Sequence, residues 1–423
     1  MRWDAARLRR AAVVGAAVVG GYVVLLVVLL SVGARVTPPE SATALTPAGG
    51  GIGAAAHQLL GRPGGTDFLV DYVSAKALRT DDDAYAITAD LTERFGEPWP
   101  VSTANPHPPT LLPLVLPFTA LRYTWALSAW ALAMIGVYAA TARVVGATWL
   151  ASVGIAFGLA VTFPGAFAIG NPLPLIGLGA AIAIRYRHDP ALAGIGLALA
   201  AAPKLSGLLL VVPFLLAWRW RTLLVAGGIL GFLAAVPVAF QRDIWSRYLD
   251  LGVEGARLNA DRGDNGSLFK LVETWGLPSA VAVLAIGAAT LALVLRRREL
   301  FTPLVWTMVA ALPIAWMYSL VTLLPVAVIL VLRGRPVVRL LVAVATALML
   351  ASPPAGQWPV TMFPVVLVVM FVAMILDTGA LPGPARDPDP ASIPAWIPGR
   401  WSRTPDGAAQ PDLTRQTGGS AAR

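Results

Sequence analysis

Residues 11–34 read AAVVGAAVVGGYVVLLVVLLSVGA and contain no charged side chain. About 20 apolar residues in a helix cross the hydrocarbon core of a bilayer, because each residue advances the helix by about 1.5 Å. Similar blocks recur along the chain as far as Leu376. A soluble core would intersperse polar residues at the helical period, and these blocks mostly lack them. The pattern predicts an all-α, polytopic membrane protein with a transmembrane bundle of about 11–13 helices.

The amount and the placement of charge agree with this class. Charged residues make up 13% of the 423 residues, against roughly 25% in soluble domains. The net charge of +9 does not indicate a nucleic-acid partner, because the basic residues form short clusters between apolar blocks. By the positive-inside rule, such clusters mark cytoplasmic loops. The clusters are Arg2 to Arg10, Arg185 and Arg187, Arg219 and Arg221, Arg296 to Arg298, and Arg333 and Arg335.

Cysteine and histidine usage excludes several kinds of site. The chain has no cysteine, so disulfides, thiolate catalysis and thiolate metal sites are excluded. Its three histidines are scattered, and isolated histidines do not make a metal site. No Walker loop, Rossmann fingerprint or nucleophile elbow is present. We therefore expect no metal and no cofactor.

The order of basic and apolar segments predicts the topology. The N-terminal arginines place the N-terminus in the cytoplasm and the loop from Ala34 to His107 outside. Counting the passes that follow puts Arg185 and Arg187 outside as well, against the charge rule. One segment between Pro108 and Asn171 must therefore be re-entrant, or one must be two short passes. The passes are expected at about 109–121, 124–142, 147–169, 172–184, 189–202, 205–217, 222–240, 279–295, 302–316, 317–332, 337–351 and 359–376.

The transmembrane domain is therefore expected over residues 1–376, with outer loops at 34–107 and 241–278. The tail at 377–423 is rich in proline, aspartate and glycine, which favours a disordered cytoplasmic segment. The multi-span chain is expected in the plasma membrane, with its functional surface on the extracytoplasmic face.

An amphipathic helix over Asp67 to Thr80, lying on the membrane, is predicted by the helical spacing of apolar residues in the first outer loop. Asp81, Asp82 and Asp83 then break the helix. We interpret these three aspartates as solvated loop, with weak binding of a divalent cation as the alternative.

Asp67 is the candidate general base. A carboxylate held near apolar side chains at the bilayer surface loses hydration, which raises its pKa toward values suited to accepting a proton. The alternative is a helix N-cap, because an aspartate near a helix start bonds free N–H groups. Asp71 lies one turn further along on the same face and competes for the role.

Lys204 lies in AAPKLS at 201–206, between two apolar runs. An ammonium near bilayer depth costs about 2.5–3.5 kcal/mol or more, so such a residue usually faces a cavity and meets an anion. A lipid phosphate is the natural anion here, and a lysine that snorkels to the interface is the alternative.

Two further polar positions border the outer loops. Asn265 and Ser267 offer hydrogen bonds suited to sugar hydroxyls and stand near Arg257 and Arg262, with a helix cap as the alternative. His107 precedes two prolines, where a boundary residue is more common than a catalyst.

Taken in order, these motifs resemble glycosyltransferase family 87, of the GT-C superfamily that uses polyprenyl-phosphate sugars. DFLVDY at 67–72 is similar to the family's Asp-Phe-x-x-Tyr-Tyr, and Tyr85 matches a later tyrosine. HPP at 107–109 is similar to Tyr-Pro-Pro before an apolar pass. The segment from PK at 203–204 to RWR at 219–221 resembles a lysine-containing turn, an apolar run and a basic end. NGSL at 265–268 matches Asn-x-Ser-Leu.

The resemblance covers roughly residues 60–335. It implies transfer of a mannosyl or arabinofuranosyl group, with inversion, from a polyprenyl-phosphate sugar to a cell-envelope glycolipid or glycan, as in actinobacterial members of the family. It implies Asp67 as general base, and Lys204 with Arg257 or Arg262 as ligands of the donor phosphate. The implied substrate-binding residues are Asp71, Tyr72, His107, Asn171, Asn265, Ser267, Trp316 and Tyr318.

The chain departs from the family pattern at two places. It has Gly170-Asn171 where the family often has Gly-Gln, and Tyr318 near the position of a histidine in a late pass. A transporter or lipid flippase is the alternative function, although no internal repeat is evident and the notable polar residues gather at the outer surface. An inactive scaffold in envelope synthesis is the third possibility.

Overall fold

The computed structural model describes residues 66–80, 82–97, 104–162, 170–252, 254, 265–315, 317–350 and 362–377. The expected first span at 11–34 and the tail after Asp377 lie outside these residues. Within the described part, the regular structure comprises 16 α-helices with short 3-10 and π segments, and no strand. The predicted all-α class is therefore confirmed.

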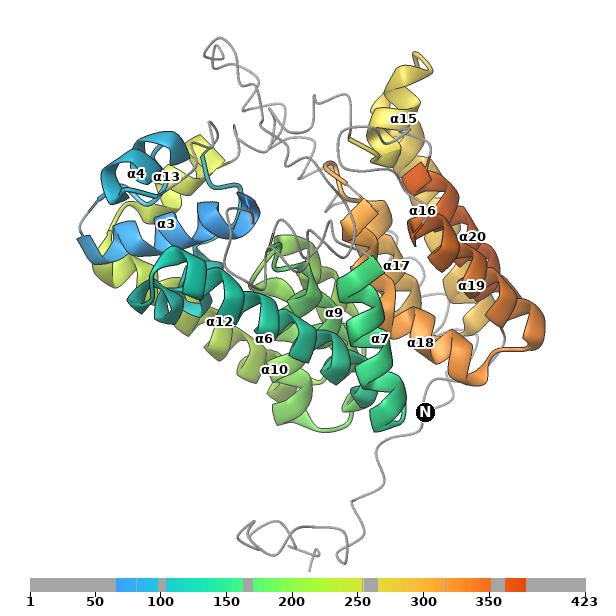
Figure 1. The fold of residues 1–423 in the computed structure, drawn as a ribbon. Coiled ribbons are helices and arrows are strands. Elements are labelled where there is room, and N and C mark those ends of the chain that lie inside the picture. The colour runs from blue at the N-terminus through green and yellow to red at the C-terminus, as the bar shows by residue number, and fades with distance from the viewer. Residues whose placement is uncertain are drawn as a thin grey trace, which may run out of the picture. The chain divides into compact units, whose positions relative to one another are not determined.

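The elements follow one another as an up-and-down series of apolar helices (Figure 1). In chain order they are α3 (Thr66–Thr80), α4 (Thr88–Phe95), η1 (Pro109–Leu111), α5 (Leu112–Val115), η2 (Leu116–Ala120), α6 (Tyr123–Val144), α7 (Trp149–Thr162), α9 (Leu173–Arg185), α10 (Pro190–Ala201), η3 (Leu205–Leu210), α11 (Val211–Leu216), α12 (Trp220–Phe240), α13 (Ile244–Arg247), η4 (Tyr248–Gly252), α15 (Leu268–Thr274), α16 (Ser279–Arg297), α17 (Phe301–Ala310), η5 (Met317–Leu323), α18 (Leu324–Arg333), α19 (Pro336–Leu350) and α20 (Met362–Leu376).

Three of these helices, α6, α12 and α16, are long and apolar enough to cross a membrane. Their exposed leucines and phenylalanines, such as Leu224 and Phe232 on α12, fit contact with lipid tails. The remaining apolar helices have 10–17 residues and lie close to the expected pass positions. Together they support a multi-pass membrane protein.

The helix ends fall into two groups. One group, the arginine end, gathers basic residues from several helices. There, Arg187 lies within electrostatic range of Arg185, Arg333 and Glu299. The other group, the Asp67 end, holds α3 and the residues that contact it. Both ends carry charges of both signs, because Arg94 pairs with Asp82 beside α3 and Arg297 pairs with Glu299 and Asp377.

The segment from η1 to η2 is the one on which the predicted topology is in conflict. It begins after His107, which contacts Asp71, and ends before Leu121, whose carbonyl accepts a hydrogen bond from Tyr72 Oη at 2.8 Å. Both of its ends therefore contact α3. Its prolines remove backbone donors and divide the helical run into short 3-10 and α pieces. The re-entrant alternative stays a prediction, and residues 107–121 are called the re-entrant segment after it.

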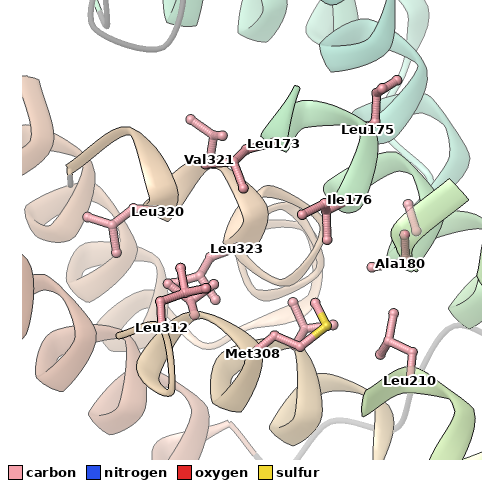
Figure 2. Packing of buried hydrophobic residues seen from close by; sticks show 14 of the residues in the cluster. Leu173, Leu175, Ile176, Ala180, Leu210, Met308, Leu312, Leu320, Val321 and Leu323 are labelled. Atoms are coloured by element: carbon pink, nitrogen blue, oxygen red, sulfur yellow. The ribbon is translucent and has the colours of Figure 1, made fainter. Parts of the chain in front are cut away.

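Close packing of α9 on α10 forms the hairpin that carries two site residues at its open end. A Cβ on Gly179 would lie 2.4 Å from Ala200 N, and one on Gly196 would lie 2.6 Å from Ala183 N. Only glycine allows the two backbones to approach so closely, as in other membrane helix pairs. On its other face, α9 packs against η5 and α18, and Figure 2 shows Ile176 of α9 in the same buried apolar cluster as Val321 of η5.

The structure corrects two details of the first outer loop. The helix over Asp67 to Thr80 forms as predicted, but it does not lie on a surface with one exposed face. Most of its side chains are buried, because α4, α5, η2, α6 and α12 pack around it. Asp82 is not solvated loop either: it is buried and forms an ion pair with Arg94 at 2.6 Å. Residues 351–361, which include the end of the pass expected at 337–351 and the start of the pass expected at 359–376, lie outside the described structure.

Candidate functional site

Asp67 stands in the first turn of α3 and contacts the open end of the α9–α10 hairpin. Asn171 Nδ2 donates a hydrogen bond of 2.6 Å to Asp67 Oδ2. Asn171 is itself held by Leu173 N, which donates to Asn171 Oδ1 at 2.9 Å. Among the described residues, no backbone N–H of α3 bonds the Asp67 carboxylate, so its observed partner does not fit a simple N-cap.

Gly170 sets the distance between these two segments. Its φ is +68°, and a Cβ at this position would lie 2.5 Å from Phe68 Cβ. Glycine is required both by the left-handed backbone and by the close approach. Trp130 Nε1 donates to Gly170 O at 2.8 Å, and the Trp130 and Phe68 rings stack with centroids 5.2 Å apart. The start of α3 is therefore fixed against α6 and the turn before α9.

Asp71 and His107 form the second polar contact of the site. His107 Nδ1 lies 2.9 Å from Asp71 Oδ1, and Asn105 Nδ2 donates to the same oxygen at 3.1 Å. Both Asp71 and His107 are buried. Tyr85 Oη donates to His107 O at 2.7 Å, which joins the α3–α4 turn to the start of the re-entrant segment.

Lys204 lies in the turn between α10 and η3, at the same end of the hairpin as Asn171. Thr110 Oγ1 donates to Ala202 O at 2.7 Å and ties this turn to the re-entrant segment beside His107. The Lys204 side chain is partly buried. No hydrogen bond or ion pair to its Nζ occurs among the described residues, which leaves the ammonium available to an anion.

Asp67 and Lys204 share one electrostatic environment. Burial raises the pKa of Asp67 above its usual 3.8, while His107, Asn171 and Lys204 oppose that rise. Burial likewise lowers the pKa of Lys204 from its usual 10.5, and Asp67 opposes that fall. Each group therefore favours the charged form of the other, although loss of water disfavours both charges. Asp67 remains partly exposed, whereas Asp71 is fully buried, so Asp67 is the carboxylate that a substrate can reach.

The second motif region, around Asn265, is bonded within the protein. Asn265 Nδ2 donates to Pro313 O at 3.0 Å, and Ala315 N donates to Asn265 Oδ1 at 3.0 Å. Ser267 Oγ accepts from Lys270 N at 3.1 Å and caps α15, as the alternative interpretation predicts. These side chains hold the turn before η5, which carries the partly buried Tyr318.

Of the other predicted site residues, only Tyr72 lies in the described structure. It is buried, and its hydroxyl donates a hydrogen bond to Leu121 O, so it supports the re-entrant segment. Its burial raises the pKa of the phenol to about 12. Arg257, Arg262 and Trp316 lie outside the described residues. They stay predictions.

Sequence reasoning missed two residues. Asn105 bonds both Asp71 and His107, and Thr110 holds the turn that carries Lys204. The only available signal for Asn105 was its place two residues before His107, because the contact with Asp71 joins residues 34 positions apart. Nothing in the sequence marks Thr110. Among the described residues, no group of three potential ligands is placed to hold a metal ion.

Comparison with known proteins places this arrangement in a family. Residues 106–353 match glycosyltransferase family 87. No match was found among curated proteins or among solved structures. The family match begins just before His107 and includes Asn171 and Lys204, while α3 with Asp67 precedes it. Because the match covers more than half of the chain, this protein belongs to glycosyltransferase family 87.

Proposed function

We propose that this chain transfers a mannosyl or arabinofuranosyl group from a polyprenyl-phosphate sugar to a cell-envelope glycolipid or glycan. The observation that supports the proposal is that Asp67, bonded to Asn171 at the open end of the α9–α10 hairpin, and Lys204, in the turn after that hairpin, lie within range of each other's charge. A partly exposed carboxylate beside an ammonium with no described ion-pair partner provides a base and an anion ligand in one place.

In the proposed reaction, Asp67 takes the proton from an acceptor hydroxyl. The hydroxyl oxygen attacks the anomeric carbon on the face opposite the phosphate, so the configuration inverts. The bond from that carbon to the phosphate oxygen breaks, and the polyprenyl phosphate leaves with one additional negative charge. Lys204 stabilises this developing charge electrostatically. Arg257 and Arg262 are proposed as further ligands of the phosphate.

Asn171 orients the base. Its hydrogen bond of 2.6 Å fixes the Asp67 carboxylate and opposes the rise in pKa caused by burial. A base that is too acidic accepts a proton poorly, and one with too high a pKa is already protonated. The opposing effects of burial and of Asn171, His107 and Lys204 therefore keep Asp67 ionisable while making it more basic than an exposed aspartate.

The extracytoplasmic face is proposed for the site, because the positive-inside rule applied to the N-terminal arginines puts the loop that holds Asp67 on that side. Lipid-linked donors carry their own leaving group, so a site on that face needs no nucleotide. The acceptor is proposed to approach from the side where α3 and α4 of the first outer loop lie near α13 of the second (Figure 1).

The test is an assay of purified protein in proteoliposomes with two radiolabelled donors, polyprenyl-phosphate mannose and polyprenyl-phosphate arabinofuranose. A cell-envelope glycolipid fraction serves as the acceptor. We expect label to move from one donor to the acceptor, and protein with Asp67→Ala to leave the donor intact. Movement of unmodified lipid across the vesicle membrane, without sugar transfer, would instead identify a flippase.

A further inference from the structure

Asp71 is an enclosed carboxylate for which the proposed reaction has no direct use. Its side chain has 0% exposure. Asp71 Oδ1 accepts a hydrogen bond from Asn105 Nδ2 and also contacts the His107 ring. Asp71 Oδ2 has no hydrogen-bond partner among the described residues. A buried carboxylate without a cationic or donor partner is expensive, so the contact with the His107 ring is the interaction that makes its burial tolerable.

His107 is immobilised at three points. Its backbone N–H donates to Asn105 Oδ1 at 2.8 Å, and its carbonyl accepts from Tyr85 Oη at 2.7 Å. Its ring is fixed through Nδ1 at 2.9 Å from Asp71. A ring held in this way has one polar atom left for another partner, Nε2. No described residue hydrogen-bonds Nε2, and this atom is not among the enclosed atoms that lack a partner.

The fixed ring lies in the immediate surroundings of Asp67. Asp71 and Asp67 are one helical turn apart on the same face of α3. Among neighbouring side chains, His107 has the largest effect on the pKa of Asp67, ahead of Asn171 and Lys204. The hydrogen bond from Thr110 to Ala202 holds the re-entrant segment against the Lys204 turn. The charged groups that act on Asp67 are therefore His107, Asp71 and Lys204.

We propose that His107 binds the phosphate of the donor through Nε2, and that Asp71 is the positioning residue that fixes its ring. This inference rests on the proposed function. With Nδ1–H donated to Asp71, Nε2 is directed away from α3 and can donate to a phosphate oxygen when the ring carries its second proton.

The Asp71–His107 pair suits a leaving phosphate for an electrostatic reason. The diester has one negative charge and the departing monoester has two, so a cationic donor binds the product more strongly than the substrate. His107 and Lys204 would then approach the phosphate from two different segments of the chain. In the motifs that this chain resembles, both positions of the pair are tyrosine, so the chain departs from those motifs at both Asp71 and His107.

Two substitutions of His107 separate ligand binding from support of the fold. In His107→Asn the side-chain amide reaches the position of Nδ1 and keeps the bond to Asp71, but nothing replaces Nε2. In His107→Gln the longer amide reaches the position of Nε2 and loses the bond to Asp71. The readout is equilibrium binding of radiolabelled decaprenyl phosphate to purified protein in detergent, alongside the thermal midpoint of each variant.

We expect His107→Asn to keep the wild-type thermal midpoint and to weaken binding by about tenfold to a hundredfold, the loss of one charge-assisted hydrogen bond. His107→Gln should bind more tightly than His107→Asn, even though its midpoint is lower. Asp71→Asn should weaken binding, and the double variant with His107→Asn should be no weaker than His107→Asn alone, because both act through one contact.

His188→Gln is the matched control. His188 pairs with Arg219 at the arginine end and should leave binding unchanged. Wild-type affinity in His107→Asn would overturn the phosphate role of His107, while sugar transfer by the same protein would leave the proposed function standing. A wild-type protein that neither binds decaprenyl phosphate nor transfers sugar would overturn both.

Discussion

Replacing Gly170 by alanine tests whether the contact between α3 and the α9 turn governs the site. The new Cβ would lie 2.5 Å from Phe68 Cβ, and carbon atoms in contact are about 3.5–4.0 Å apart. The turn and α3 must therefore separate by about 1 Å. Because Asn171 follows Gly170 and Asp67 precedes Phe68, that separation acts directly on the hydrogen bond of 2.6 Å between them.

The expected magnitude has two parts. A left-handed backbone costs a non-glycine residue about 1–2 kcal/mol, and overpacking a tight contact costs about 1–3 kcal/mol more. Displacing a catalytic group by about 1 Å lowers turnover by about a hundredfold. Gly170→Ala should therefore reduce both the thermal midpoint and kcat.

Gly276→Ala is the matched control, because Gly276 has a similar φ of +70° and no atom lies within 4 Å of the position that a new methyl group would take. It should show the backbone cost alone, with kcat unchanged. The assay is sugar transfer from the radiolabelled donor, with thermal unfolding of both purified variants in the same detergent. Equal effects of the two substitutions on kcat and on the midpoint would refute the reasoning, since the clash with α3 would then have no consequence.

Three further predictions follow from other contacts. Asn171→Ala removes a hydrogen bond that favours the ionised base, so the pKa of that base rises and the acid limb of the kcat profile moves to higher pH; an unchanged limb would contradict this. Asp377→Ala removes one of the two carboxylates paired with buried Arg297, at 2.9 Å, and leaves Glu299 at 3.1 Å; it should cost about 1.5–3 kcal/mol, seen as a lower thermal midpoint, while Asp377→Asn should cost less. Because the chain has no cysteine, single cysteines can report topology: an impermeant maleimide should label Ile87→Cys in intact cells and Arg335→Cys only after lysis, and the reverse would invert the proposed orientation.

The helical bundle could be predicted because its signal is local. Blocks of apolar residues locate the membrane helices, and the pass expected at 124–142 corresponds to α6 at Tyr123–Val144. A re-entrant segment is one of two alternatives left by the charge pattern, and it stays a prediction. The contacts of His107 and Leu121 with α3 join distant parts of the sequence, and no local pattern encodes them.

The candidate site was predictable in its residues but not in its geometry. Asp67 and Lys204 were recognisable as charged groups in unusually apolar surroundings, a property of nearby sequence. The burial of α3 was not predictable, because Asp67 to Thr80 is enclosed by segments that follow much later in the chain. The ion pair of Asp82 with Arg94 also emerged only from the folded structure, whereas the cap formed by Ser267 is a local contact and was one of the two sequence-based interpretations.

The side-chain chemistry of Asp67 can be separated from its support of the fold. Burial raises the pKa of Asp67, so the ionised carboxylate disfavours the folded state as pH rises from 3.8 through the folded pKa. Asp67→Asn removes that charge and keeps an oxygen that can accept from Asn171. The variant should therefore unfold at the same temperature as the wild type, or at a higher one, at neutral pH.

The most direct measurement is turnover of purified Asp67→Asn with a polyprenyl-phosphate sugar donor, made alongside binding of polyprenyl phosphate. Loss of a general base should lower kcat by about 10²–10⁴-fold while the lipid phosphate still binds. Turnover within about threefold of the wild type would exceed what loss of a general base allows and would remove Asp67 from the reaction.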